Sequence, residues 1–361
     1  MNGQHSRHPE RQYSVLMPLL SEASFIRQDH RILASRFDVI RINVRSVGGL
    51  WSALLALRGT DLVFCWFGSL RFLPLVVAAR ALRIPVVVVA GGYDVAAEPS
   101  IGYGNMRGGW RRILGRLLFR LATRVLPYSS AGAAEVTQNA GVSVDRQRTI
   151  PLGFTDTGSD ASAANKELLV IVVAGVDEST IHRKGLLTCA RASALLPDVP
   201  FAFVGSGTSD ALRQLRDTSS PAAQFHGFVS DATLADLLNR AAVILQPSIH
   251  EAFGCSVAEA MLWNCIPIVS DRGSLPEVVG DAGIIIPAGD AQALAAAVTR
   301  CLSGEVRPSG MRRRIREHFS IERREEALLA ELSSVLAARW SRVDGTSAER
   351  PSRDTLETRF Q

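Results

Sequence analysis

The chain has 361 residues, of which 47% are hydrophobic and 21% charged, with a formal net charge of +5. This length and apolar content allow two domain cores and exclude a disordered protein. The 5 cysteines are scattered and form no C-x-x-C pair. Such usage is typical of a reducing compartment, so we expect a cytoplasmic protein rather than a disulfide-stapled secreted one.

The sequence predicts neither a signal peptide nor a membrane-spanning segment. Residues 1–12 are polar and lack an apolar core, so we expect no signal peptide. The most hydrophobic run, Phe72–Val89, contains Arg80, Arg83 and Pro85, which predicts a helix followed by a buried strand. Residues 341–361 are polar and predict a disordered tail.

Short apolar segments alternate with helical patterns in two successive series. The first series predicts strands at Tyr13–Leu19, Val39–Ile42, Asp61–Trp66, Val86–Ala90, Arg124–Tyr128 and Thr149–Ile150. The second predicts strands at Leu168–Ala174, Phe201–Gly205, Gln224–His226, Val243–Gln246, Ile266–Val269 and Ala282–Ile286. Predicted helices between them include Trp51–Leu57, Arg71–Arg83, Leu186–Leu196, Asp231–Arg240 and Ser256–Trp263. Apolar strands alternating with helices indicate parallel sheets covered on both faces.

Two such series predict an α/β protein with two Rossmann-like, doubly wound domains that face each other across a cleft. We place the first domain at residues 1–156, a linker at 157–167 and the second domain at 168–320. A helix over 321–340 is expected to pack back on the body. Ligands of open α/β sheets bind beyond the carboxyl ends of the strands, so the cleft is the predicted ligand site.

The segment Pro247–Glu277 is the most informative of the chain. It sets Glu251 and Glu259 on either side of a Phe-Gly turn that opens a predicted helix. A helix start presents backbone N–H groups and favours phosphate, and the flanking carboxylates can accept sugar hydroxyls. We interpret the segment as a nucleotide-sugar site. In the alternative interpretation, Ser256 and Glu259 form a capping box and Glu251 is a solvated acid.

Two further features accompany the carboxylates in the predicted second domain. Arg183 and Lys184 follow its first strand and supply the positive charge that a departing diphosphate requires; the alternative is a solvated basic loop. Gly205 ends the next strand and lets backbone approach a ligand closely. Phe228 follows the third strand and fits either a nucleobase contact or ordinary core packing.

With these residues identified, the segment from about residue 168 to 283 resembles the donor-binding half of retaining glycosyltransferases of family 4, which have the GT-B fold. The first half is similar more loosely, through Gly92-Tyr93-Asp94 and the segment Ile150–Asp156. The motifs that carry the resemblance are Lys184-Gly185, Val204–Gly207, Gly227–Val229, Pro247-Ser248, the E-x7-E pair, Pro267–Val269 and Gly273–Glu277.

The resemblance implies a role for each matching position. Glu251 would lie near the transferred sugar, and Lys184, helped by Arg183, would neutralise the diphosphate; these make Glu251 and Lys184 the catalytic candidates. Glu259 would bind the ribose, and Asp94 would lie on the acceptor side. The implied donor-binding set is Arg183, Lys184, Gly205, Val229, Phe253, Gly254, Cys255 and Glu259.

The resemblance also implies the reaction and its partners. A UDP- or GDP-linked sugar would be the co-substrate, with no other cofactor, and a glycan or lipid-linked molecule the acceptor, in polysaccharide or glycolipid biosynthesis. No D-x-D motif occurs and the histidines are scattered, so we expect no metal.

Three positions depart from the pattern of many relatives. Val176 stands where a basic residue is common, Gly91 where a histidine is common, and residues 18–22 replace a Gly-Gly loop. These departures leave two alternatives open. One is a nucleotide-sugar epimerase of the same fold, and the other is a non-catalytic partner subunit that binds the donor.

A basic stripe is predicted within the segment Met106–Arg124. Its arginines recur every four residues, which places them on one face of a helix: Arg112, Arg116, Arg120 and Arg124. Such a face fits an anionic membrane surface, here the inner face of the cell membrane. The alternative is a surface helix whose apolar face lies in the core. No nucleic-acid fold surrounds it, so we expect no nucleic-acid partner.

Overall fold

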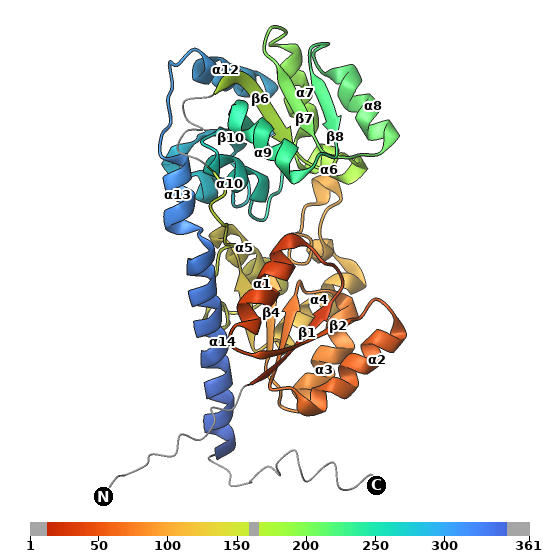
Figure 1. Ribbon diagram of the computed structural model, residues 1–361. Coiled ribbons are helices and arrows are strands. Elements are labelled where there is room, and N and C mark those ends of the chain that lie inside the picture. The colour runs from red at the N-terminus through yellow and green to blue at the C-terminus, as the bar shows by residue number, and fades with distance from the viewer. Residues whose placement is uncertain (1–12, 159–165, 345–361) are drawn as a thin grey trace, which may run out of the picture.

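The computed structural model describes residues 13–158 and 166–344. Residues 1–12, most of the predicted linker at 157–167 and most of the predicted tail at 341–361 lie outside the described residues. The described chain forms two α/β units stacked one above the other, with a long helix running along the side of the first (Figure 1).

The first unit contains a parallel sheet with the strand order β2-β1-β3-β4-β5. Its strands are β1 (Ser14–Leu19), β2 (Asp38–Asn43), β3 (Leu62–Trp66), β4 (Val86–Ala90) and β5 (Arg124–Pro127). Its helices are α1 (Ser24–Ala34), α2 (Val47–Ala56), α3 (Leu73–Ala81), α4 (Gly109–Leu121) and α5 (Ser130–Glu135). Short helical turns lie at Leu57–Gly59, Leu70–Phe72, Pro99–Ile101, Asn105–Arg107, Val136–Ala140 and Val144–Arg146.

Helices cover both faces of this sheet. Successive side chains of a strand point to opposite faces. In β1, therefore, Leu16 packs in the core beneath α2, α3 and α4, whereas Val15 and Met17 pack in the core shared with α1. The sheet is thus buried on both sides, as its continuous Val/Ile/Leu strands predict.

The second unit contains a parallel sheet with the order β11-β10-β9-β6-β7-β8. Its strands are β6 (Glu167–Val173), β7 (Phe201–Val204), β8 (Gln224–Gly227), β9 (Ala241–Gln246), β10 (Ile266–Ser270) and β11 (Ile284–Ile286). The chain begins at β6, runs outward to β8, and then returns to place β9 on the other side of β6. The strand order therefore reverses between β6 and β9, which is where open α/β sheets bind their ligands.

The helices of the second unit flank this sheet. They are α6 (Glu178–Arg183), α7 (Leu186–Ala194), α8 (Ser209–Thr218), α9 (Asp231–Arg240), α10 (Cys255–Leu262), α11 (Leu275–Val279), α12 (Ala291–Leu302) and α13 (Met311–His318), with a short turn at Gly280–Ala282. The loops after β6 and β9 lead into α6 and α10, and they point toward the first unit (Figure 1).

Helix α14 (Ile321–Asp344) leaves the second unit and packs on the first (Figure 1). Its Leu328 and Leu332 share one buried cluster with Val15 of β1. Near its start, the buried Arg324 guanidinium holds both carboxylate oxygens of Asp29 in α1, each at 2.7 Å. The C-terminal helix is therefore a structural part of the first unit.

Two local predictions are wrong. Thr149–Ile150 forms no strand, because Pro151 has no N–H with which to continue the bonding that Ile150 N makes to Pro127 O at 2.9 Å. Arg124 is not on the predicted basic helix: α4 ends at Leu121, and Arg124 begins β5, where it pairs with Val87. The helical spacing of the arginines continued past the real helix end.

Candidate functional site

The loops after β6 and β9 bring together the predicted catalytic residues. Arg183 ends α6, Lys184 is its C-cap, and Ile249 of the β9 loop donates its N–H to the Arg183 carbonyl at 2.8 Å. Gly185 has a left-handed φ of 66°, and a Cβ there would lie 2.1 Å from the carbonyl oxygen of Pro247. Only glycine allows the two loops to approach this closely.

Lys184 and Glu251 form an ion pair at the carboxyl ends of β6 and β9. The Lys184 Nζ lies 3.4 Å from the Glu251 Oε2. The side-chain amide of Gln246 donates to the same oxygen, and the Ser256 hydroxyl in turn donates to the Gln246 Oε1 at 2.8 Å. Ser248 contributes a longer contact of 3.5 Å to Glu251. The carboxylate is thus held by a lysine, an amide and a hydroxyl.

Glu251 is ionised in this setting. Its side chain is only 12% exposed, and burial by itself raises the pKa of a carboxyl group. The positive charges of Lys184 and Arg183 outweigh that effect, so the pKa of Glu251 is lowered below its ordinary value. The result is a buried negative charge beside two cations at the strand-order reversal.

Arg183 faces the first unit. Its guanidinium carbon lies 4.9 Å from the ring centroid of Tyr103, a cation–π geometry. Its Nε atom is buried and, among the described residues, has no hydrogen-bond partner. Because a guanidinium donor without a partner is costly to bury, this atom is suited to an anionic ligand.

Glu259 lines a cavity of about 620 Å³ between the two units. Burial, and then the charge of Asp231, raises the pKa of this carboxyl. Cys255 lines the same cavity, and burial together with the charges of Glu259 and Glu251 raises the pKa of its thiol to about 12. Both acids therefore act electrostatically on the thiol at the start of α10.

The capping-box interpretation is wrong. Helix α10 begins after Gly254, which has a left-handed φ of 95°, and no side chain caps its first turn. The Ser256 hydroxyl bonds Gln246 instead, and Glu259 faces the cavity. Neither Ser256 nor Glu259 therefore caps the first turn of α10.

The remaining donor-side candidates have mixed placements. A Cβ on Gly205 would lie 1.9 Å from the carbonyl oxygen of Ala174, so this glycine is required by the packing of the loops after β6 and β7. The Phe253 ring is buried against Phe154 and Tyr128 of the first unit. The Phe253 side chain is therefore part of the packing between the two units.

The loop after β8 leaves one aromatic ring exposed. Val229 packs partly buried against the core formed by β6, β9 and α9. Phe228, in contrast, is 84% exposed, so its interpretation as a core residue is wrong. An exposed aromatic ring remains compatible with a nucleobase contact.

Asp94 lies at the carboxyl end of β4, buried at the interface of the two units. Its carboxylate accepts the N–H of Gly68 at 2.8 Å and that of Gly91 at 3.1 Å, and burial raises its pKa to about 7. It lines a second cavity, of about 470 Å³, together with Tyr103 and with Ala252 of the β9 loop. The predicted acceptor-side residue thus faces the predicted donor side.

The four arginines of the predicted stripe are not brought together. Arg124, in β5, pairs with Glu331 of α14 at 2.6 Å. The Arg116 Nε donates to the Asn139 carbonyl at 2.8 Å, and Arg112 is half-buried. Of the four, only Arg120 is fully exposed, and Arg112, Arg116 and Arg124 are partly buried.

Sequence reasoning missed Gln246 and Tyr103. Gln246 carried a signal, because a polar residue ends the otherwise apolar strand β9. Tyr103 carried none, since it reaches Arg183 only through the packing of one unit on the other. His250 also reaches the first unit: its Nε2 forms a hydrogen bond with Oε1 of Glu135 at 2.7 Å, which helps to fix the β9 loop.

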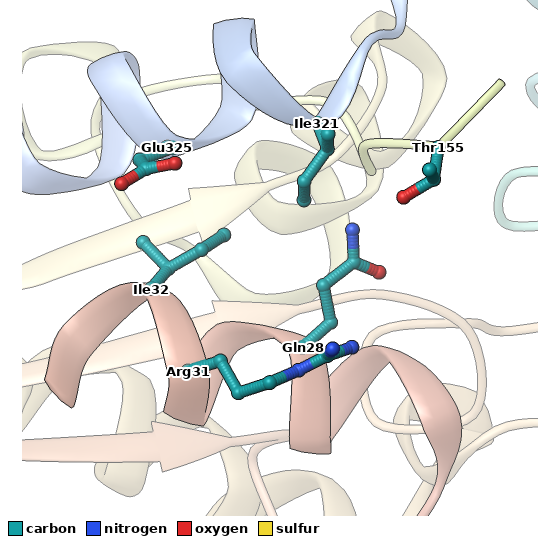
Figure 2. Close-up of a pocket in the computed structure, with 6 residues that line it drawn as sticks. All are labelled: Gln28, Arg31, Ile32, Thr155, Ile321 and Glu325. Carbon is teal, nitrogen blue, oxygen red and sulfur yellow. The ribbon is translucent and has the colours of Figure 1, made fainter. Parts of the chain in front are cut away.

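A third cavity lies outside this site. It measures about 200 Å³ and opens between α1, the start of α14 and Thr155, with Arg31 and Glu325 at its walls (Figure 2). None of the predicted site residues lines it. In residues 13–158 and 166–344, no group of three or more His, Cys, Asp or Glu side chains is arranged to hold a metal. No helix in these ranges has the length and apolarity to cross a bilayer.

The chain is similar to known proteins in sequence and in fold. Residues 168–304 match the family model of glycosyl transferases group 1. Two solved structures superpose over nearly the whole chain: HepE of Anabaena in complex with UDP and glucose (TM-score 0.71, 18% identity, 90% of this chain and 100% of that one), and sucrose-phosphate synthase of Thermosynechococcus elongatus (TM-score 0.71, 19% identity, 91% and 100%). The chain has the fold of the GT-B glycosyltransferases.

Curated relatives of this GT-B chain match it over part of their length. A phosphatidyl-myo-inositol mannosyltransferase of Mycolicibacterium smegmatis is 29% identical over 57% of this chain and 53% of its own length. The O-antigen chain mannosyltransferase B of Escherichia coli is 33% identical over 36% of each chain. An MMP alpha-(1->4)-mannosyltransferase of Mycolicibacterium hassiacum is 32% identical over 56% and 51%. The matched region thus spans about half or less of these relatives.

Proposed function

We propose that this protein is a retaining glycosyltransferase, which moves a sugar from a nucleoside diphosphate donor to a glycan or lipid-linked acceptor without a metal. The observation that carries the proposal is the Lys184–Glu251 pair of 3.4 Å at the strand-order reversal. The match to glycosyl transferases group 1 covers both residues. The mannosyltransferase relatives favour a mannose or related hexose donor, and the UDP complex of HepE keeps a UDP sugar among the candidates.

In this reaction the protein positions the two substrates and stabilises the charges that develop in the transition state. The acceptor hydroxyl oxygen forms a bond to the anomeric carbon as the bond from that carbon to the diphosphate oxygen breaks. The hydroxyl proton passes to the departing phosphate oxygen on the same face of the sugar. Lys184 and Arg183 offset the negative charge that builds on the diphosphate, and Glu251 orients the sugar and stabilises positive charge at the anomeric carbon.

Replacing either member of the pair tests the assignment. We expect Lys184→Ala and Glu251→Ala each to lower turnover by about 10²- to 10³-fold, because each removes a group that stabilises transition-state charge. Lys166→Ala is the matched control: Lys166 lies at the amino end of β6, where its Nζ bonds the Leu238 carbonyl at 2.8 Å. Transfer from UDP- and GDP-linked hexoses is measured, with thermal melting as a check of folding.

The same assay separates the alternatives. Release of nucleoside diphosphate with the sugar transferred in unchanged anomeric configuration supports the proposal. A nucleotide sugar epimerised at C2 would identify an epimerase, and tight donor binding without turnover would identify a partner subunit. Wild-type turnover in both Lys184→Ala and Glu251→Ala would contradict the roles assigned here.

We also propose that the first unit rests on an anionic membrane, through a broader surface that includes Arg120 of the predicted stripe. Helices α2, α3 and α4 lie in a row over one sheet face. Their outer surface exposes large apolar side chains: Val47, Trp51, Leu55, Val77, Leu82, Trp110, Ile113 and Leu117. Tryptophans at such positions favour the level of lipid headgroups. We call these three helices the basic helical face.

The charge of the basic helical face supports this partner. Residues 39–60, 62–93 and 99–134 contain no Asp or Glu. Exposed arginines surround the apolar side chains: Arg45, Arg58, Arg71, Arg80, Arg83, Arg107, Arg111 and Arg120. Near an anionic surface each such arginine contributes about 1 kcal/mol. Membrane contact here would suit a lipid-linked acceptor and the predicted location at the inner face of the cell membrane.

A further inference from the structure

A tyrosine hydroxyl ends in the 470 Å³ cavity without a partner. Tyr128 directly follows β5 and is only 7% exposed. Its ring packs between Trp66 and Phe253, with ring centroids 6.4 Å from each. Within the described ranges its hydroxyl makes no hydrogen bond. The ring is buried, while the hydroxyl reaches the open space of the cavity, where it is available to bond a ligand.

Gly91 makes room for this tyrosine. A Cβ on Gly91 would lie 1.9 Å from the Tyr128 Cζ and 2.2 Å from its hydroxyl oxygen. The glycine is therefore required for space, and any side chain at this position would displace the ring. Tyr128, which follows β5, thus fills the space beside Gly91.

The chemistry of the cavity wall indicates the class of ligand. Its volume falls in the range of roughly 300–1,000 Å³ that small-molecule sites occupy. The wall combines aromatic rings, which pack on apolar C–H groups, with polar groups that bond hydroxyls. The aromatic residues are Phe67, Tyr93, Tyr103 and Tyr128, and the other polar residues are Ser69, Asp94 and Asn105. A sugar ring offers both kinds of surface, because it carries C–H faces and a rim of hydroxyls.

We propose that this cavity binds the ring of a carbohydrate and that the Tyr128 hydroxyl forms a hydrogen bond to one of its hydroxyl groups. Ala252, beside Glu251, closes the cavity from the second unit, so the bound ring lies next to the Lys184–Glu251 pair. Burial raises the pKa of Tyr128 well above its ordinary value, and the hydroxyl therefore keeps its proton and can donate it. The inference rests on the proposed glycosyl transfer and names a residue that acts in it.

Tyr128→Phe removes the hydroxyl and keeps the ring. Calorimetry with UDP, UDP-glucose, GDP and GDP-mannose compares the variant with the wild-type protein. We expect the nucleotide Kd to stay within about twofold and the Kd of the bound nucleotide sugar to rise roughly fivefold or more, the value of a lost hydrogen bond. Tyr13→Phe, the same change outside the cavity, should alter neither. Gly91→Ala should weaken sugar binding as Tyr128→Phe does, because its Cβ displaces the ring.

The outcomes distinguish donor from acceptor. If only the acceptor KM rises in Tyr128→Phe, the ring in the cavity belongs to the acceptor, which also supports the proposal. Unchanged affinities and unchanged KM values for both substrates would overturn it. Failure of the proposed function shows differently, as a wild-type protein that binds none of the four nucleotides. Saturation-transfer NMR with free mannose and glucose then decides: a signal lost in Tyr128→Phe supports the cavity assignment, and equal or absent signals reject it.

Discussion

The positive charge of Lys184 keeps the buried carboxylate of Glu251 ionised, and the effect of Lys184 on the pKa of Glu251 can be measured. In Lys184→Met the burial of Glu251 remains while the nearest cation is lost. We expect the pKa of Glu251 to rise, because a nearby opposite charge favours the ionised carboxylate and burial alone disfavours it. NMR titration of ¹³C-labelled glutamate side chains reports it. An unchanged pKa of Glu251 would show that Arg183 alone carries the electrostatic role.

Asp94 predicts a pH dependence of stability. Its pKa is about 7 in the folded protein against 3.8 for an ordinary Asp, so folding favours the protonated form. The stability from this group is present in full below about pH 4 and is lost as the pH rises through 7. In Asp94→Asn we expect this decline in the free energy of unfolding, on the order of 2–4 kcal/mol, to disappear.

Urea denaturation between pH 4 and 8 measures that decline. Asp38→Asn, an exposed residue at the start of β2, serves as the matched control and should keep the wild-type profile. The same slope in Asp94→Asn and in the wild-type protein would mean that another group titrates in this range.

Single residues of the site were predictable where a local pattern names them. Lys184 and Glu251 lie in the loops after α6 and β9, Glu259 lies in α10, and local sequence motifs predicted all three as site candidates. Tyr128 does not, because its role depends on the missing side chain of Gly91, a residue from a different strand. Contacts between side chains of loops that are far apart in the chain cannot be predicted from a single sequence.

Helix α14 depends on one buried ion pair. Arg324 bonds both oxygens of Asp29 and the carbonyls of Ile150 and Pro151, so its removal leaves an uncompensated buried carboxylate. We expect Arg324→Met to lower the free energy of unfolding by about 3–5 kcal/mol. Chemical denaturation measures it, with the exposed neighbour variant Arg323→Met as control.

The double variant Asp29→Leu with Arg324→Met completes the test. Removing both charges leaves no unpaired group, so much of the lost stability should return. Additive losses in the double variant would instead assign the effect to packing.

Elements were predicted best where caps and strand composition agree. Asp231–Arg240 was predicted with the bounds of α9, whose N-cap Ser230 accepts the N–H of Thr233. The end of α4 was missed because no glycine or proline follows Leu121, and the chain turns extended at Ala122 to enter β5. Pairing in the sheet overrides the helical spacing there, which is a tertiary effect.

The whole molecule predicts a membrane orientation. In the double variant Trp51→Glu with Trp110→Glu, a negative charge replaces each of two exposed rings on the basic helical face, 64% and 62% exposed. We expect binding to vesicles of phosphatidylglycerol and phosphatidylcholine to fall at least tenfold, with nucleotide affinity unchanged. Vesicle co-sedimentation measures it at low and high salt.

The matched control makes the same kind of substitution, an exposed apolar residue to Glu, in the second unit instead of the first. Leu195→Glu with Ile285→Glu alters exposed apolar residues of the second unit and should leave vesicle binding intact. Equal loss in both double variants, or none in the first, would reject the basic helical face as the membrane surface.

At this scale the sequence indicated two parallel sheets and a cleft, but neither strand order nor the destination of the last helix. Both depend on which apolar faces meet, and many pairings satisfy the same pattern. The reversal between β6 and β9, which selects the functional loops, was therefore visible only in the structure.

The return of α14 to the first sheet has a consequence for biosynthesis. A nascent chain leaves the ribosome from its N-terminus, yet the side of β1 that carries Val15 and Met17 is covered by Leu328 and Leu332. The part of that apolar side that α14 covers stays exposed until almost the entire polypeptide has been translated. Folding of the first unit therefore depends on synthesis of the second. A prematurely terminated chain would expose apolar sheet surface to chaperones and proteases.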